Sequence, residues 1–260
     1  MEFESLIYQR EGFRAVLTLN RPARRNALSP GLVEDLRAAL LAARDDDDVR
    51  LVMITGAGER AFCAGGDLGA GMMSQGVVTA HHGRAGFADL LRAIRDLGKP
   101  VVARVQGDAL GGGFGLMLAC DLVVAADDVR FGTPEVRLGL FPYVIMATIF
   151  RNVGRKAGME LILTGDKISA TRGLELGLVN QVVPRADLDA ATDALCARIE
   201  RHSPAILRLG RQAFARMSEM RYDDALDYLN GMLTINTLAE DAAEGVAAFL
   251  GKREPEWKGK

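Results

Sequence analysis

The 260-residue sequence predicts an α/β fold with parallel or mixed sheets, on the basis of three observations. Short apolar runs typical of buried strands alternate with segments whose apolar residues recur at helical spacing. Glycine-rich turns join them, and glycine accounts for 29 of the 260 residues, or about 11% against a usual share of about 7%. From about residue 155 the pattern becomes mainly helical. Hydrophobic residues make up 49% of the chain, which excludes disorder, and the glycines lack the three-residue period of collagen.

The predicted strands are short, and residues that break or turn the chain bound them. In 14–19 apolar residues alternate with others, and 49–55 is a continuous apolar run that ends at Gly56. The expected strands are 6–8, 14–19, 49–55, 101–105, 122–126 and a late one within 177–183.

Capping residues and apolar spacing indicate the helices. Ser29 followed by Pro30 is an N-cap with proline at the first helical position, so we expect a helix to about Arg44. A glycine-rich turn over 107–113 precedes a short helix. The other expected helices are 87–96, 114–120, 186–218, 222–239 and 241–250.

Charge and cysteine usage limit the partners and the compartment. A net charge of −2 provides no broad basic field, so we expect no nucleic acid and no membrane as partner. Three distant cysteines, Cys63, Cys120 and Cys196, are typical of reduced thiols in a cytoplasmic protein. The N-terminus lacks a signal-peptide pattern. The longest uncharged apolar stretch, 138–150, is shorter than the span of about 20 residues that a bilayer requires.

Several familiar catalytic patterns are missing or incomplete. The segment Gly56–Ala61 fits G-x-G-x-x-A, but 68–88 has no acidic residue to bind a ribose, which argues against a nicotinamide cofactor. There is no phosphate-binding G-x-x-x-x-G-K-[ST] and no G-x-S-x-G nucleophile turn. His81 and His82 lack the partners of a zinc motif, so we expect no metal.

Two glycine turns remain as candidates for chemistry. One is Ala64-Gly65-Gly66-Asp67, and the other is Gly111-Gly112-Gly113, which opens a helix. Both follow strands, so two parallel strands would place the turns side by side. Glycine allows a ligand to approach the backbone closely, and two convergent N–H groups form an oxyanion hole. The residues alone leave open a second interpretation, in which these are tight turns without chemistry.

The motifs in and around these turns resemble the crotonase (enoyl-CoA hydratase/isomerase) superfamily. The matching segments are Leu19–Pro22, Asn26-Ala27, Ala61–Asp67, Asp108–Gly113, Ala119–Asp121, Phe131–Glu135, Leu163–Gly165, Gly177–Val179 and Ala248–Arg253. The resemblance implies a crotonase-like spiral of ββα units over residues 1–195. It also implies a helical C-terminal region over 196–260 that builds a homotrimer or a dimer of trimers.

The resemblance further implies an acyl-CoA substrate and no cofactor beyond its CoA moiety. Family motifs place the oxyanion N–H groups on Gly66 and Gly112. They place CoA contacts on the loop residues Arg25, Ala27, Ala64, Asp67 and Leu68, and contacts from a neighbouring subunit on Phe249 and Lys252. Each of these contacts has an alternative interpretation. The loop arginines could be solvated, Phe249 could take part in ordinary helix packing, and Asp67 could cap the following segment.

The sequence departs from the two-carboxylate hydratase pattern. Glu135 matches the second glutamate, but Gly115 stands at the position of the first. One carboxylate is sufficient for a 1,3-proton shift, so the sequence favours enoyl-CoA isomerisation. A divergent hydratase, thioester hydrolysis or decarboxylation, and a non-catalytic CoA-binding protein remain alternatives. Asp108 is a surface residue or a substitute proton carrier. The bulky residues Met117, Phe141, Tyr143 and Met146 line an acyl pocket or fill the core.

Overall fold

The structure, a computed structural model, describes residues 2–69 and 77–260. Its larger sheet has six strands in the order β1-β2-β3-β5-β7-β10. Strand β1 is antiparallel to β2, and all other neighbours in this sheet are parallel. The strands are β1 (Leu6–Glu11), β2 (Arg14–Leu19), β3 (Leu51–Gly56), β5 (Val101–Val105), β7 (Leu122–Ala126) and β10 (Gln181–Val183).

A smaller sheet has four strands in the order β4-β6-β8-β9. Its strands are β4 (Ala61–Cys63), β6 (Asp108–Leu110), β8 (Arg130–Gly132) and β9 (Lys167–Ser169), of which only β9 is antiparallel to its neighbour. The chain passes from β3 to β4, from β5 to β6 and from β7 to β8, and helices follow each pair. Each turn of the chain therefore adds one strand to both sheets, which confirms the predicted spiral of ββα units.

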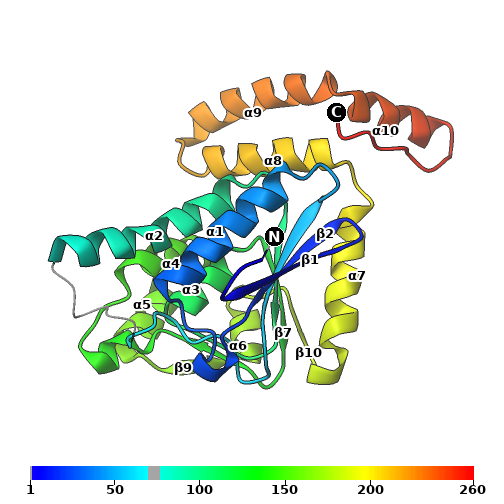
Figure 1. Cartoon of the computed structure of the whole chain (residues 1–260). Coiled ribbons are helices and arrows are strands. Elements are labelled where there is room, and N and C mark those ends of the chain that lie inside the picture. Colours follow the sequence, from blue (N-terminus) through cyan, green and yellow to red (C-terminus); the bar gives the residue numbers. More distant parts are fainter. Residues whose placement is uncertain (1, 70–76) are drawn as a thin grey trace.

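Helices cover the large sheet and form the C-terminal part of the molecule. In Figure 1, α1 and α2 lie to one side of the large sheet and α7 lies to the other, while α8, α9 and α10 cross above. The helices are α1 (Pro30–Asp45), α2 (Val77–Asp96), α3 (Gly112–Ala119), α4 (Tyr143–Asn152), α5 (Arg155–Thr164), α6 (Ala170–Glu175), α7 (Leu188–Glu200), α8 (Pro204–Met217), α9 (Tyr222–Thr237) and α10 (Glu240–Leu250), with 3-10 turns η1 (Pro22–Arg24), η2 (Pro134–Leu138) and η3 (Arg185–Asp187).

Local capping explains where several helices begin. The Ser29 hydroxyl accepts the N–H of Leu32, as expected for an N-cap followed by proline. The single helix expected over 186–218 is wrong, because the chain breaks between α7 and α8. Ser203 caps α8 in the same way and Pro204 opens it, a signal that the apolar pattern masks. Helix α2 also begins at Val77, earlier than expected.

The expected division between residues 195 and 196 falls inside α7. This helix packs against β3, β5 and β7 of the large sheet, whereas α10 packs against α8 and α9.

The three cysteines are buried free thiols, and burial raises the pKa of Cys63 to about 12 and that of Cys196 to about 11. No helix within the described ranges combines the length and apolarity needed to cross a membrane.

Candidate active site

The two glycine turns lie against each other, because β4 and β6 are parallel neighbours. A Cβ on Gly113 would lie 2.2 Å from the carbonyl oxygen of Cys63, and one on Gly65 would lie 3.3 Å from the backbone nitrogen of Gly112. Gly65 also has φ +96, a conformation that L side chains rarely adopt. Glycine is therefore required at both positions for the turns to touch.

The N–H of Gly66 points toward the second turn. In the bridge between Leu28 and Gly66, Leu28 donates to the Gly65 carbonyl (2.8 Å) and accepts from the Asp67 N–H (3.0 Å). The N–H of Gly66 itself therefore faces away from Leu28. A Cβ on Gly112 would lie 3.7 Å from the Gly66 nitrogen. Gly112 opens α3, where helical N–H groups have no intrahelical acceptor, and neither N–H has a hydrogen-bond partner among the described residues.

The Glu135 carboxylate lies beside the second turn. Pro134 begins η2, and Gly139 ends it with φ +71. The Oε1 atom of Glu135 lies 2.7 Å from the position that a Cβ on Gly111 would take. Its Oε2 atom is buried and has no hydrogen-bond partner within the described structure. Burial raises the pKa of the Glu135 carboxyl, and the hydrogen bond from its own backbone N–H offsets only part of this effect. The three candidate catalytic residues, Gly66, Gly112 and Glu135, thus come together from three separate elements.

The loop residues expected to contact CoA also come together. Backbone hydrogen bonds join 25–28 to 64–67, including one from the Ala64 N–H to the Arg25 carbonyl (3.0 Å). Asn26 anchors the first segment. It is fully buried at φ +54, and its side-chain amide donates to the carbonyls of Ala57 (3.0 Å) and Ala61 (2.9 Å). Leu68 follows at the surface, with 52% of its area exposed.

Asp67 is held by Arg21, a residue that the sequence analysis did not single out. The Arg21 guanidinium donates to Asp67 Oδ2 (2.8 Å) and to the Ala27 carbonyl (2.5 Å), and so bridges both segments. Asp67 Oδ1 also accepts the Gly69 N–H (3.1 Å), which is the local cap considered for it. The hydrogen bond from Arg21 is the main cause that lowers the pKa of Asp67. Arg21 lies within the Leu19–Pro22 motif, so this motif could have identified it as a site residue.

Comparisons with known proteins show the family of this chain. A sequence model described as enoyl-CoA hydratase/isomerase matches residues 11–260. This chain belongs to the enoyl-CoA hydratase/isomerase family. It is 37% identical over 257 residues to the 2,3-dehydroadipyl-CoA hydratase of Escherichia coli (strain K12), covering 98% of this chain and 99% of that protein. It is 36% identical over 262 residues to a carnitinyl-CoA dehydratase of Escherichia coli (strain SMS-3-5 / SECEC), covering 99% of each.

Solved structures support the same family fold. The crystal structure of an enoyl-CoA hydratase from Mycobacterium smegmatis superimposes with a TM-score of 0.94 at 36% identity, over 98% of this chain and 99% of that one. An enoyl-CoA hydratase from Bacillus anthracis gives a TM-score of 0.94 at 31% identity, over 99% and 100%. Both the resemblance and the crotonase-like fold expected from the motifs are thereby confirmed.

In this protein the side chain of Ile145 fills the space beside Gly115. A Cβ on Gly115 would lie 2.1 Å from Cγ2 of Ile145, a residue of α4 that is only 3% exposed. A longer side chain at 115 has no room unless α4 moves. Position 115 therefore supplies no second carboxylate to act with Glu135. The sequence pattern did not reveal that Ile145 occupies the space beside this position.

The structure does not bring Phe249 and Lys252 to the two turns of the same chain. Phe249 lies on α10 with 83% of its area exposed, and Lys252 follows the helix at φ +53. Figure 1 shows α10 well separated from α3. Phe249 is therefore not packed into the core of its own chain.

The structure also places the remaining candidates from the sequence, Asp108 and the four bulky residues. Asp108 accepts the Arg130 N–H (3.0 Å) and pairs with Lys167 (3.3 Å), so its carboxylate ties β6 to β8 and β9. Met117 is fully buried in the core, whereas Tyr143 is 75% exposed, with its ring 5.2 Å from that of Phe141. Phe141 and Met146 are partly buried against the core. The described residues contain no group of three or more potential metal ligands placed to hold an ion.

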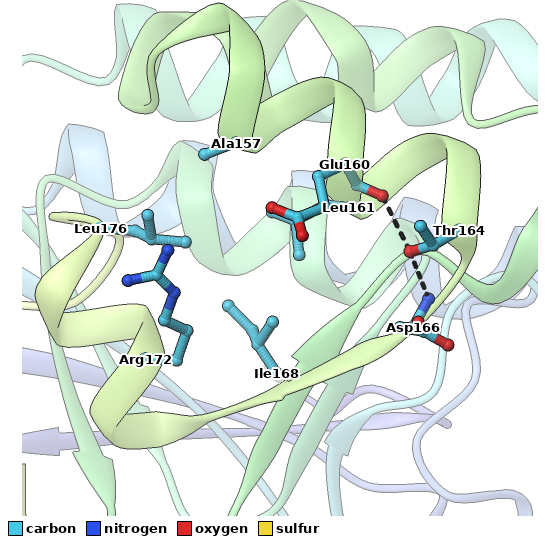
Figure 2. Close-up of a pocket in the computed structure, with 8 residues that line it drawn as sticks. All are labelled: Ala157, Glu160, Leu161, Thr164, Asp166, Ile168, Arg172 and Leu176. Atoms are coloured by element: carbon cyan, nitrogen blue, oxygen red, sulfur yellow. Dashed lines mark hydrogen bonds between the residues drawn. The ribbon is translucent and has the colours of Figure 1, made fainter.

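A small pocket lies between α5, β9 and α6 (Figure 2). It has a volume of about 120 Å³, and none of the candidate catalytic or CoA-binding residues lines it. Hydrogen bonds from Thr164 to the Glu160 carbonyl and from the Asp166 N–H to Thr164 shape one wall. Thr133, two residues before Glu135, donates to the Leu161 carbonyl (2.8 Å) and so fixes η2 against α5.

We expect Gly115→Ala to destabilise the protein by about 1–3 kcal/mol, because its methyl group would overlap Ile145. Ile145→Ala in the same chain removes the 2.1 Å contact with Cγ2 and leaves only the 2.7 Å contact with Cβ, so the double variant should lose less than the sum of the single changes. Urea unfolding of all four proteins measures this coupling. Gly210→Ala is the control, since open space surrounds that glycine in α8 and alanine favours helix. Strict additivity of the two changes would contradict the overlap.

We expect Glu135→Gln to stabilise the fold at neutral pH. The pKa of Glu135 is raised in the folded state, so the folded state holds this proton more tightly than the unfolded chain does. Its favourable contribution is complete below the ordinary pKa of 4.5 and is lost as pH rises through the raised value. The variant should therefore have a higher Tm at pH 7 and match the native protein near pH 4. Equal Tm values at both pH values would show that the carboxylate is not desolvated.

Proposed function

We propose that this protein catalyses double-bond isomerisation of an enoyl-CoA thioester. The N–H groups of Gly66 and Gly112 bind the thioester oxygen, and Glu135 removes the proton from one carbon and returns it to another. The proposal is carried by Oε2 of Glu135, which is buried beside the Gly111–Gly113 turn and has no hydrogen-bond partner in the described part of the chain.

The chemistry matches what these groups supply. Removing a proton next to a thioester carbonyl produces an enolate, whose negative charge gathers on the carbonyl oxygen. Loss of one donor to such an oxyanion typically costs about 3–4 kcal/mol of transition-state stabilisation. A carboxylate with a raised pKa is a stronger base than an ordinary one, and a single base is sufficient when the same group returns the proton.

The loop formed by 25–28 and 64–68 is the proposed site for the CoA moiety. Arg25 supplies a cation at its edge, while Ala27, Ala64 and Leu68 present small or apolar surface and backbone groups to the adenine. The Asp67 carboxylate is paired with Arg21, which supports a role for Asp67 in shaping this loop rather than in direct contact with phosphate. No cofactor beyond the CoA of the substrate is proposed.

Hydration of an enoyl-CoA is the second candidate, and it is favoured by the similarity to proteins named as hydratases. Hydration is easiest with one group that positions water and another that delivers a proton. Gly115 supplies neither, and Asp108 is engaged with Arg130 and Lys167. Isomerisation requires only the groups that the described site contains.

Mass spectrometry of products from 2-enoyl- and 3-enoyl-CoA substrates separates these reactions. Isomerisation leaves the mass unchanged, whereas hydration adds one water and hydrolysis releases free CoA. Glu135→Gln should lower kcat by about 10²–10⁴-fold, and native activity should fall with acidification through the raised pKa of Glu135. Glu160→Gln, in the pocket of Figure 2, is the matched control and should retain activity. Rapid hydration without isomerisation would refute the proposal, and full activity of Glu135→Gln would remove this carboxylate from the reaction.

We expect a homotrimer or a dimer of trimers. Phe249 and Lys252 lie away from the turns of their own chain, and Phe249 is 83% exposed, which supports contact with CoA held by a neighbouring copy. Sedimentation equilibrium should give the mass of three or six chains, and a monomer at micromolar concentration would contradict this arrangement.

A further inference from the structure

Asp241 is a buried carboxylate near the start of α10, only 1% exposed. Its Oδ2 accepts the Ser203 hydroxyl (2.6 Å) and the Gly259 N–H (3.0 Å), and its Oδ1 accepts the Lys258 N–H (2.7 Å). Its own N–H donates to the Lys260 carbonyl (2.9 Å). Burial of a charge is costly unless hydrogen bonds compensate, so these donors are required for the carboxylate to remain there.

Two of the three donors come from residues 256–260, which we call the clasp. Figure 1 shows the chain turning back after α10 and returning to the start of that helix. Trp257 lies against the middle of α10, where a Cβ on Gly245 would be 3.1 Å from its ring, and its indole N–H donates to the Arg201 carbonyl (2.7 Å). The Glu256 N–H donates to Glu244 (2.8 Å), a residue of α10 that also pairs with Arg253.

Asp241 therefore joins α10, α8 and the clasp at one point. The Ser203 hydroxyl that donates to Asp241 also caps α8 by accepting the Ile206 N–H (3.1 Å). Phe249 is eight residues along α10 from this point, or about 12 Å along the helix axis. A small rotation of α10 about its start would displace Phe249 and Lys252 more than residues near Asp241, because displacement grows with distance from the point of rotation.

We propose that Asp241 and the clasp position α10, and so set where Phe249 and Lys252 meet the CoA moiety held by another copy of the chain. The inference rests on the proposed function for the contact between α10 and CoA. Asp241 is a positioning residue: it touches neither CoA nor the reacting carbons, and it acts through the orientation of the helix that it begins.

Coenzyme A itself is the probe, so that the test does not depend on which reaction occurs. Asp241→Asn preserves shape but directs an amide N–H at a backbone or hydroxyl donor. Deletion of 256–260 removes the clasp and retains Asp241. Each should raise the Kd for coenzyme A by about tenfold in calorimetry, with kcat at saturating substrate within about twofold. The two changes combined should have no more effect than one, because they disrupt the same contact.

Hydrogen exchange tests whether the effect is local. Amides of α10 should exchange faster in both variants, while those of β3 and β5 remain as in the native protein. Glu254→Ala is the matched control, an acidic residue of the same tail whose side chain has no hydrogen bond or ion pair among the described residues. It should bind coenzyme A normally.

Unchanged affinity in the Asp241 and clasp variants would overturn the proposal, and so would faster exchange throughout the molecule with a joint loss of kcat and affinity. Phe249→Ala separates this inference from the proposed function. If Phe249→Ala weakens binding and the clasp variants do not, only the positioning role fails. If neither weakens binding, the contact between α10 and CoA fails, and the positioning role fails with it.

Discussion

The contact between the two glycine turns is the constraint on which the candidate site depends. Parallel pairing of β4 and β6 brings the chain after each strand to the same edge of the small sheet. There the backbones approach so closely that a Cβ on Gly113 would lie 2.2 Å from the Cys63 carbonyl oxygen. Only backbones without side chains can pack in this way. The same contact brings the N–H of Gly66 near that of Gly112, and it leaves Gly111 open to the Glu135 carboxylate.

The burial of the Glu135 carboxylate supports its proposed role in catalysis, because that burial costs stability. Polar atoms that are buried in native proteins nearly always have hydrogen-bond partners, yet the Oε2 atom of this carboxylate has none among the described residues. The surroundings that hold it are themselves well satisfied, since Thr133 donates to Leu161 and the Gly111 N–H donates to the Gly132 carbonyl. Satisfied surroundings around a carboxylate with one unsatisfied oxygen support the proposal that Glu135 acts as a base.

Features governed by neighbours in the chain were accessible from the sequence. The N-cap at Ser29, the buried run of β3 and the glycine turns follow from local conformational preferences, and the ordered motifs identified the family. Features that depend on competing local signals were not. The apolar spacing of 186–218 continues through the break before α8, because the same periodicity serves two helices that pack in different directions. Asp108 looked like a candidate acid, and only its pairing with Lys167 of β9 explains it.

The sequence by itself therefore determined the family, the ββα architecture and the identity of the two turns and of the carboxylate beside them. These depend on residue type and on spacing along the chain, which the sequence records directly. The tertiary structure alone decided that Ile145 fills the space beside Gly115, that Arg21 holds Asp67 and that Asp241 receives the C-terminal tail. Each of these is a contact between elements that are distant in the chain. Such contacts depend on how side chains of particular shape and direction pack together in the fold, which the type of a single residue does not specify.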